Sequence, residues 1–410
     1  MKNEELEVLR EKINLIDDEI LTLLSNRSEI VLQIGKHKNE KEVLDLEREQ
    51  KILDRLITNA KGAYSKDTII RLWREIFQSS ERLQNVTNSD IQAKRSIESI
   101  SIYKGGKSVL DTEKKIIKLS SNENPYGPSP KIIEVVETQF LKKNLNRYPE
   151  IDGATLRKEI SRRFSLNYER IILGSGSDEI LLFVALGFCK DGDEILHATH
   201  GFEMYSIVSK VVGAVPKKIK EDQNFEINID TIIKSITVST KVIYIASPNN
   251  PTGTYLSRSK IKNLLKKIGK DIIVVIDGAY VEYVQKEDYD KGFSLCDEFD
   301  NLILTRTFSK AYGLAALRIG WCYTSEKVAD IIKKIKPPFN TTSISQAIAI
   351  KALEDSKYID EIVKLNTEVK NWFESELKSL NIKTKITEGN FSLIETSNDG
   401  AAKISNHLAK

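Results

Sequence analysis

The segment that decides the fold is T-R-T-F-S-K-A-Y-G-L-A-A-L-R-I-G, residues 305–320. It follows the apolar run 301–304, which has the character of a strand, so Lys310 comes just past a strand end. Open α/β sheets bind their ligands at that edge. A lysine there can form a Schiff base with a cofactor aldehyde, and Arg318 follows eight residues later. One lysine alone would be interpreted as a solvated surface charge, so the assignment of Lys310 to a cofactor site depends on the residues that accompany it.

Three other segments place matching groups at strand ends. Asp277 ends the apolar run 272–276, where a carboxylate can keep a pyridinium nitrogen protonated. The turn G-S-G-S-D-E, residues 174–179, opens a helix, and small residues there expose backbone N–H groups to a phosphate. A glycine-rich turn by itself is weak evidence. In S-P-N-N-P-T-G, residues 247–253, Asn250 can reach a ring hydroxyl from a rigid turn.

The chain around these motifs has an α/β pattern. Residues 241–246, 271–277 and 301–305 are short, continuous apolar runs, as expected of strands that are buried on both faces. Helical stretches such as 260–267 separate the runs. The pattern predicts right-handed crossovers in a mostly parallel sheet.

In their order along the chain, these motifs resemble the fold-type-I aminotransferases, and more closely the histidinol-phosphate aminotransferase-like branch. The segments S-N-E-N-P-Y-G-P, residues 121–128, and R-Y-P, residues 147–149, add to the resemblance, which covers about residue 96 to the end. It implies pyridoxal 5'-phosphate as the cofactor, a large domain at about 140–335, and a small domain formed by 101–139 and 336–410.

The same resemblance implies site residues. Lys310 would bind the cofactor covalently and shuttle the proton, while Asp277 would contact the ring nitrogen. The phenolic oxygen would meet Asn250 and Tyr280, and Phe202 would stack on the ring. The residues implied around the phosphate are Gly176, Ser177, Asp178, Thr307, Ser309 and Arg318, with Tyr148 arriving from the other subunit. Asn124 would line the substrate side.

Two departures from the family pattern stand out. Gly278 replaces the acidic residue that is common in the family's D-E-A-Y motif, although D-G-A-Y occurs in part of the family. The family also continues for a few dozen residues past the strand at 390–394 and supplies there the arginine that binds the substrate α-carboxylate. This sequence stops at Lys410 and is short at its C-terminus. The alternatives are a fragment, which we favour, and an impaired transferase.

The first 86 residues have a different texture, rich in Leu, Glu, Lys and Arg. Apolar residues recur there at steps of three and four, which predicts one long helix. They are Leu6, Leu9, Ile13, Ile16, Ile20, Leu23, Leu24, Val31 and Ile34. The same periodicity predicts helices over 46–59 and 66–84. Three helices with one so long cannot easily bury this stripe in a single copy, so we expect an intertwined dimer.

Arg27 lies on the apolar stripe and must meet an anion or lose its solvation. An intersubunit salt bridge is one interpretation. Polar residues on the predicted helices favour a binding site instead: Lys38 on the first, Asp45, Arg48 and Glu49 on the second, and Ser80 and Gln84 on the third. Arg10 precedes Arg27 by 17 residues, roughly 26 Å along a straight helix, so one small ligand cannot touch both in one chain.

Residues 4 to about 84 thus resemble the all-helical (AroQ-type) chorismate mutases, through L-R-E-K-I at 9–13, G-K-H-K at 35–38 and D-L-E-R-E at 45–49. The resemblance implies that Arg27, Arg48 and the partner's Arg10 hold the two carboxylates of chorismate. Lys38 and Gln84 would face the ether oxygen, and Glu49 the ring hydroxyl. Ser80 would assist a carboxylate, and Asp45 would frame the ring end. A charged helical dimerisation module is the alternative.

The whole sequence therefore predicts a multidomain enzyme: a chorismate mutase domain at 1–86, a linker at 87–100 and an aminotransferase domain at 101–410. We expect conversion of chorismate to prephenate, and amino transfer from a donor such as glutamate to prephenate or an aromatic 2-oxo acid. Histidinol-phosphate amino transfer is the runner-up, and an inactive, cofactor-binding regulatory module is the third possibility.

Composition bounds this interpretation. A net charge of +3, from 62 basic and 59 acidic side chains, gives no indication of nucleic acid binding. The cysteines Cys189, Cys296 and Cys322 lack metal-ligand or disulfide spacing, and we expect no metal. With no secretory signal and no membrane-spanning run, we expect a cytoplasmic homodimer acting on small molecules.

Overall fold

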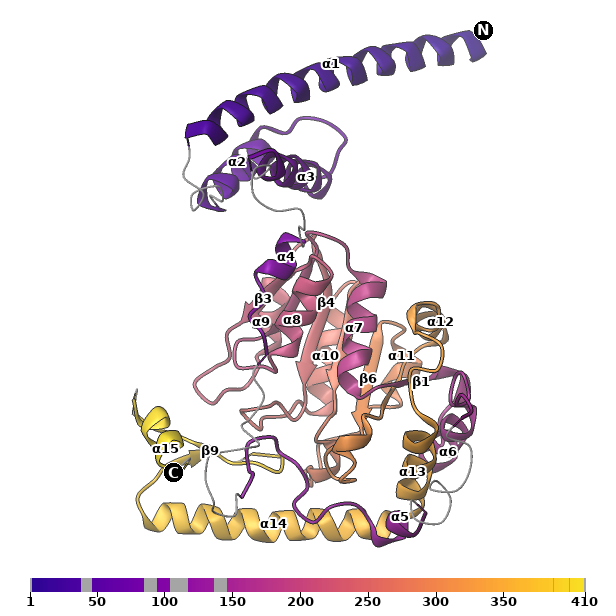
Figure 1. The fold of residues 1–410 in the computed structure, drawn as a ribbon, viewed down its shortest axis with the longest axis vertical. Coiled ribbons are helices and arrows are strands. Elements are labelled where there is room, and N and C mark those ends of the chain that lie inside the picture. The colour runs from indigo at the N-terminus through magenta and orange to yellow at the C-terminus, as the bar shows by residue number, and fades with distance from the viewer. Residues whose placement is uncertain are drawn as a thin grey trace. The chain divides into compact units, whose positions relative to one another are not determined.

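The computed structural model describes residues 2–37, 46–84, 94–103, 117–135, 146–385, 387–397 and 399–408. The chain divides into two compact units, Met1–Lys94 and Arg95–Lys410. The division falls inside the segment predicted as a linker, 87–100 (Figure 1). The finer domain boundaries proposed from the sequence stay predictions.

The first unit contains α1 (Lys2–His37), α2 (Leu46–Asn59) and α3 (Lys66–Gln84). All three helices predicted from the apolar periodicity are confirmed, the second and third with the predicted ends. Val31 of α1, Leu53 of α2 and Phe77 of α3 are buried and form the small core of this unit.

The rest of the α1 stripe is exposed. A helix of 36 residues is about 54 Å long, whereas the 19 residues of α3 extend about 28 Å, so α3 can cover only about half of it. The exposed apolar residues of α1 include Leu6, Leu9, Ile13, Ile16, Ile20, Leu23, Leu24 and Ile34. One copy of the chain thus leaves this stripe uncovered among the described residues.

The second unit is built on a seven-stranded sheet with the order β1-β7-β6-β5-β4-β2-β3. Its strands are β1 (Ile171–Gly174), β2 (Glu194–Ala198), β3 (Val215–Ile219), β4 (Thr240–Ala246), β5 (Ile273–Asp277), β6 (Leu302–Thr307) and β7 (Gly320–Tyr323). Strands β2 to β6 pair in parallel, and β7 runs antiparallel to both of its neighbours. The predicted mostly parallel sheet is confirmed, and the runs 241–246, 271–277 and 301–305 correspond to β4, β5 and β6.

Helices cover both faces of this sheet (Figure 1). In β5, Val274 and Ile276 face one apolar core, whereas Ile273 and Val275 face the other. The first core includes α6 (Ala154–Phe164), α9 (Ile229–Ser235), α10 (Arg258–Lys267) and α13 (Ser343–Glu354); the second includes α7 (Ser177–Phe188), α8 (Met204–Val211) and α12 (Glu326–Ile335). Because both faces are buried, the strands need continuous rather than alternating apolar runs.

Local capping fixes where several of these helices begin. The Ser257 side chain accepts a hydrogen bond from the Lys260 N–H at the start of α10, and Thr342 does the same for Ser345 at the start of α13. Such caps satisfy backbone donors that the first turn leaves unpaired. The short elements of this unit are α5 (Pro130–Val135), α11 (Leu295–Glu298), η2 (Tyr168–Arg170), η3 (Val281–Tyr283) and η4 (Ala315–Leu317).

The remaining elements are α14 (Ser356–Ser379), the two-stranded sheet β8 (Thr384–Lys385) and β9 (Leu393–Ile394), and α15 (Gly400–Leu408). Ile362 and Val363 of α14 pack with Tyr280 and Tyr283 in a third apolar cluster. The long helix is thereby joined to the segment that follows β5. None of the helices in the described ranges combines the length and the apolar character that crossing a bilayer requires.

One segment differs from the sequence interpretation. Residues 87–100 were expected to be an aperiodic linker, yet α4 (Arg95–Glu98) forms there. It is attached to the second unit, because the Lys210 Nζ on α8 donates a hydrogen bond to the Ser99 carbonyl at 2.9 Å. Four residues are too few for apolar periodicity to be recognised, so the sequence could not have indicated this helix.

Candidate functional site

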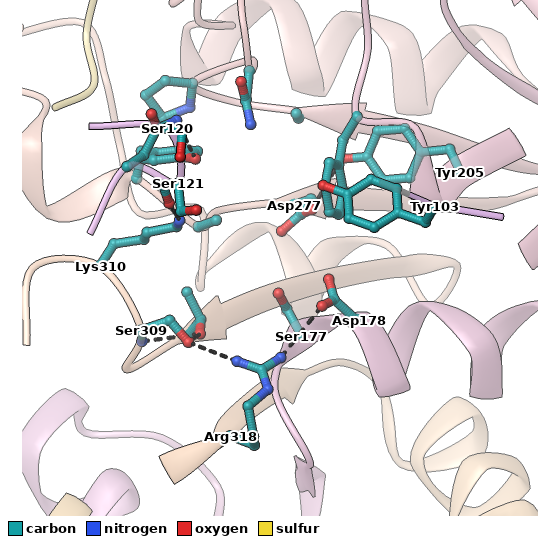
Figure 2. A pocket seen from close by; sticks show the side chains of 18 residues that line it. Tyr103, Ser120, Ser121, Ser177, Asp178, Tyr205, Asp277, Ser309, Lys310 and Arg318 are labelled. Carbon is teal, nitrogen blue, oxygen red and sulfur yellow. Dashed lines mark hydrogen bonds and ion pairs between the residues drawn. The ribbon is translucent and has the colours of Figure 1, made fainter. Parts of the chain in front are cut away.

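A cavity of about 390 Å³ opens where the parallel strands β4, β5 and β6 end. It brings together groups that are far apart in the sequence (Figure 2). Its lining residues are Tyr103, Ser120, Ser121, Asn122, Ser177, Asp178, Phe202, Tyr205, Ala246, Pro248, Asn250, Asp277, Ala279, Tyr280, Thr307, Ser309, Lys310 and Arg318. The carboxyl edge of a parallel sheet is where ligand sites of this fold class lie.

Asp277 is the last residue of β5, and its carboxylate is almost completely buried. Burial raises the pKa of Asp277, and two hydroxyl groups oppose that effect by donating hydrogen bonds. Thr305 Oγ1 donates to Oδ1 at 2.7 Å, and Tyr205 Oη donates to Oδ2 at 2.9 Å. The two donors favour the ionised carboxylate, which is the form that binds a protonated ring nitrogen.

Lys310 follows β6 and reaches the same cavity. Burial lowers the pKa of its amine, while the nearby acid Asp178 opposes that shift. The Nζ atom donates a hydrogen bond to the Ser121 carbonyl at 3.0 Å and lies 5.4 Å from the centre of the Tyr280 ring. A partly desolvated amine is deprotonated more easily at neutral pH, so Lys310 is suited to nucleophilic attack and proton transfer.

An anion cradle lies below these two residues in Figure 2. Ser177 begins α7, whose N-terminal N–H groups favour a negative charge. Thr307 Oγ1 donates to Ser309 Oγ at 3.0 Å, and Arg318 Nη1 donates to that same Ser309 oxygen at 3.3 Å. Gly176 lies beside them with a φ of +81°, a backbone conformation that favours glycine, and a Cβ there would lie 2.4 Å from Arg318 Nη2.

Asp178 lines the cavity beside this cradle. It was predicted among the residues around the phosphate, a role that stays a prediction, and its Oδ2 accepts a hydrogen bond from Arg318 Nη2 at 3.3 Å. A carboxylate beside an anion cradle repels a phosphate unless its charge is compensated. The ion pair with Arg318 compensates part of the Asp178 charge.

The ring side of the cavity is formed by Phe202, Asn250 and Tyr280. The Phe202 ring packs edge-on against Tyr205 with 5.8 Å between the ring centres. Burial raises the pKa of Tyr280 to about 12, so its phenol remains protonated and can donate a hydrogen bond. Asn122 Nδ2 donates to the Tyr280 oxygen at 3.1 Å.

Asn124 is not among the residues that line this cavity. It was predicted to line the substrate side, which stays a prediction, and its buried amide donates to the Ala311 carbonyl at 3.0 Å and accepts from the Tyr126 N–H at 2.9 Å. It shapes its loop, and the neighbouring residues Ser120, Ser121 and Asn122 line the cavity instead. The sequence motif identified the right loop but not which of its side chains point inward.

Tyr148 does not line this cavity. Its side chain is exposed and stacks on Phe339 with 4.7 Å between the ring centres. The predicted contact was to the other subunit's cofactor, which one chain cannot test, so that role stays a prediction.

Sequence reasoning missed Tyr103, Tyr205 and Thr305. Thr305 pairs with Asp277 in the β5–β6 register, so aligning the two predicted strands would have indicated it. Tyr205 lies in the first turns of α8, and only the packing of α8 on the sheet brings its hydroxyl to Asp277. No local signal distinguished Tyr103.

The helical unit holds a smaller polar group. Arg27 Nη1 of α1 donates to Ser80 Oγ of α3 at 2.5 Å, and burial lowers the pKa of Arg27. Gln84 lies one helical turn further along α3, and its Oε1 is buried without a hydrogen-bond partner among the described residues. Two predicted site residues of α1 and α3 are thus in direct contact, with a third near them.

The other predicted site residues of this unit do not take part in the contact between Arg27 and Ser80. Arg48 is exposed and Glu49 is half-buried on α2, and both make interactions of their own. Arg10 is exposed and pairs with Glu7 at 2.6 Å, far along α1 from Arg27. Lys38 and Asp45 lie outside the described residues. In the described ranges, no group of three or more potential ligands is arranged to hold a metal ion.

The donor set of the cavity fits a pyridoxal phosphate. Lys310 offers an amine, Asp277 a buried carboxylate with two hydroxyl partners, and Arg318 a cation beside the first turn of α7. Close packing supports this arrangement, since a Cβ on Gly320 would lie 2.7 Å from the Ser177 nitrogen. The chain therefore offers a covalent anchor, a ring-nitrogen partner and a phosphate cradle in one cavity.

Comparison with known families gives two matches. Residues 114–409 match the family model described as aminotransferase class I and II. Residues 9–85 match the model described as chorismate mutase type II. The two matched segments fall in the two compact units, respectively the second and the first.

Curated relatives match the second unit. A histidinol-phosphate aminotransferase of Pelagibacter ubique is 42% identical over 295 residues, which are 72% of this chain and 81% of the relative. One from Ruegeria pomeroyi is 38% identical over 304 residues, covering 74% and 83% of the two chains.

Solved structures show the same fold. The histidinol-phosphate aminotransferase of Sinorhizobium meliloti in complex with pyridoxal-5'-phosphate superposes with a TM-score of 0.65 at 22% identity, covering 68% of this chain and 76% of that one. An aromatic aminotransferase from Pyrococcus horikoshii gives a TM-score of 0.60 at 22% identity, covering 68% and 78%.

Proposed function

We propose, on the premise that the chain belongs to the aminotransferase class I and II family and carries a type II chorismate mutase domain at its N-terminus, that its two domains act on successive aromatic intermediates. The first domain would convert chorismate to prephenate, and the second would transfer an amino group to prephenate or to an aromatic 2-oxo acid. The observation that carries this proposal is the presence of both domain types in one chain.

The enzyme classes of the two domains and the cofactor of the second rest on the family matches alone. The chain is an enzyme with an isomerase domain and a transferase domain, and fold-type-I aminotransferases depend on pyridoxal phosphate. When bound, this cofactor supplies an aldehyde that carries the amino group and a ring that accepts electrons. The amino acceptor, the dimer and the cytoplasmic location belong to the proposal.

The residues of the second unit suit the steps that the protein must perform. Arg318, Ser177 and Ser309 would hold the phosphate and so fix the position of the ring. The carboxylate of Asp277 would keep the ring nitrogen protonated, and Tyr280 and Asn250 would donate hydrogen bonds to the phenolic oxygen. Lys310 Nζ, with its lowered pKa, would accept and return the proton at the reacting carbon.

The hydrogen bond from Tyr205 to Asp277 gives a direct prediction. We expect Tyr205→Phe to weaken pyridoxal phosphate binding about tenfold, because loss of a donor to a charged carboxylate leaves Asp277 less able to stay ionised. The measurement is a fluorescence titration of the cofactor-free protein with pyridoxal phosphate.

Tyr244→Phe is the matched control. Tyr244 is also fully buried, stacks on Tyr205, and donates its hydroxyl to the Leu181 carbonyl rather than to Asp277. Loss of the Tyr244 hydroxyl should leave the affinity for pyridoxal phosphate unchanged. Equal weakening in both variants would contradict the role given to Tyr205.

In the helical unit, the proposed chemistry needs neither nucleophile nor proton transfer. A pericyclic rearrangement requires a folded substrate and stabilisation of the charge that develops on the ether oxygen. Arg27 and Arg48 would bind carboxylates, since planar guanidinium groups match them. The buried amide of Gln84 would donate to the ether oxygen, with Lys38 beside it, while Glu49 and Asp45 would contact the ring end.

We further infer that this unit works as a dimer. The exposed stripe of α1 is apolar along most of its length, and a second copy of α1 would cover it. Arg10 lies 17 residues before Arg27 on α1, roughly 26 Å away along the helix axis. Only Arg10 of the partner subunit could therefore complete the carboxylate site.

Histidinol-phosphate amino transfer is the second candidate, and the names of the curated relatives favour it. The two candidates are separated by assaying amino transfer from glutamate to prephenate, to phenylpyruvate and to imidazole-acetol phosphate. We expect turnover of at least one aromatic acceptor at about tenfold or more the efficiency of the imidazole compound. Consumption of imidazole-acetol phosphate alone would overturn the aromatic assignment.

A further inference from the structure

A second cavity, of about 330 Å³, shares its wall with the first. Ala279 and Tyr280 line the first cavity, while the next residues, Val281 and Glu282, line the second. The segment after β5 therefore has one cavity on each side. Such a volume is of the size that small-molecule ligands occupy.

The floor of the second cavity is aromatic. Phe164 at the end of α6 and Phe293 pack together with 5.7 Å between their ring centres, and both contact Trp321 of β7. Leu353 of α13 and Ile359 of α14 add apolar surface. A flat, apolar body of a ligand would bury its surface well against these rings.

The interior of this cavity contains one unusual acid. Glu282 Oε2 is buried and has no hydrogen-bond partner among the described residues. Burial raises the pKa of Glu282 to about 7, although Arg306 and Lys291 oppose the effect. A shielded carboxylate oxygen without a donor costs free energy, so a ligand ammonium group that donates to it would bind favourably.

Arg306 does not donate to this Glu282 oxygen, and two of its five N–H donors bind backbone carbonyls instead. Nη1 donates to the Thr305 carbonyl at 2.7 Å and Nη2 to the Lys291 carbonyl at 2.5 Å. Gly278 makes room for it, since a Cβ there would lie 2.3 Å from Nη1. Arg306 thus stiffens the wall, and Glu282 is among the residues that line the cavity.

The rim carries two exposed cations. Arg163 and Lys291 lie 5.8 Å and 5.7 Å from the centre of the Phe164 ring, so both flank the aromatic floor. Asp360 is the other acid that lines the cavity, and it is exposed. The cavity therefore combines an inner acid, an aromatic floor and a mainly basic rim.

We propose that this second cavity binds a free aromatic α-amino acid, with its ammonium group on Glu282, its ring over Phe164 and Phe293, and its carboxylate toward Arg163 and Lys291. The choice of an aromatic amino acid over another amine with an apolar body rests in part on the proposed function, whose product class it is. The binding groups themselves are those of the cavity.

The probe is L-phenylalanine, measured by titration calorimetry on the full chain loaded with pyridoxal phosphate and reduced with borohydride, so that no amino acid can exchange onto the cofactor. We expect binding of L-phenylalanine. 3-Phenylpropionate, which lacks the ammonium, and L-alanine, which lacks the ring, should each bind about tenfold or more weakly. Equal affinity for phenylpropionate, or no binding of L-phenylalanine, would overturn the proposal.

Glu282→Gln is the decisive variant, because it keeps the shape of the side chain and removes its charge. It should weaken L-phenylalanine about tenfold or more while leaving the weak binding of phenylpropionate unchanged, which also shows that the cavity has kept its shape. Glu287→Gln is the matched control, an exposed acid of the same loop outside the cavity, and should bind like the unmodified protein. Unchanged affinity in Glu282→Gln would refute the site.

This outcome is separable from that of the acceptor assay. If only imidazole-acetol phosphate is consumed, the proposed function fails, whereas the calorimetric comparison of L-phenylalanine with its analogues stands on its own. If calorimetry shows no dependence on Glu282 while aromatic acceptors are turned over, the cavity proposal alone fails.

Discussion

Replacing Lys310 by alanine is expected to reduce amino transfer by about 10³-fold or more, because the variant lacks both the nucleophilic amine and the proton carrier. Lys310 is the cavity's only lysine among the described lining residues, so no neighbour can take its place. The covalent attachment of the cofactor should disappear as well. Mass spectrometry after borohydride reduction measures that attachment, and a coupled assay measures amino transfer.

Two further variants make the Lys310 result specific. Lys310→Arg keeps the positive charge but cannot bind an aldehyde in the same way, so it should be as inactive as the alanine variant. Lys260→Ala removes an exposed lysine paired with Glu226 and should retain full activity. Chorismate mutase activity should persist in all three. Amino transfer by Lys310→Arg at the level of the unmodified protein would show that only charge is needed there.

The sequence predicted the elements whose signals are local or repeated. The α1 stripe keeps a helical period over many turns, and the continuous apolar runs at β4, β5 and β6 are typical of a parallel sheet. Lys310 and Asp277 were identified because each directly follows a strand, and the carboxyl ends of parallel strands meet at one edge. A position relative to a strand end was enough to bring them together.

What the sequence could not predict depends on side-chain direction and on packing between distant elements. Asn124 belongs to a recognisable motif, yet its amide binds the Ala311 carbonyl and the Tyr126 N–H, and its side chain is not among those that line the cavity. Tyr205 contacts Asp277 only because α8 packs on the sheet. Gly278 seemed to be a lost acidic residue, whereas the structure gives the physical reason for glycine: the guanidinium of Arg306 occupies the space of a side chain.

Replacing Arg27 by alanine is expected to lower the mutase kcat/KM by about 10²- to 10³-fold, the effect of removing one preorganised charged donor from a partly buried site. The side chain also bridges α1 to Ser80 of α3, so circular dichroism must show that the helices remain folded. Pyridoxal phosphate attachment at Lys310 should be unchanged. Arg55→Ala, which removes an exposed arginine of α2, is the control and should keep its mutase activity. Joint loss of both activities in Arg27→Ala would indicate misfolding instead.

Subunit mixing turns the same variant into a test of the dimer. If each site combines Arg27 of one chain with Arg10 of the partner subunit, then Arg10→Ala and Arg27→Ala are each inactive alone. A mixed dimer, however, regains one intact site. Random pairing of equal amounts should restore about a quarter of the unmodified mutase activity, since half of the dimers are mixed and each has one good site. Two copies of the Arg27 variant should recover nothing. If Arg10→Ala keeps the mutase activity of the unmodified protein on its own, Arg10 has no part in binding chorismate. If both variants are inactive and mixing restores no activity although mixed dimers form, the shared site fails, because Arg10 of one chain then does not complete the site of Arg27 in the other.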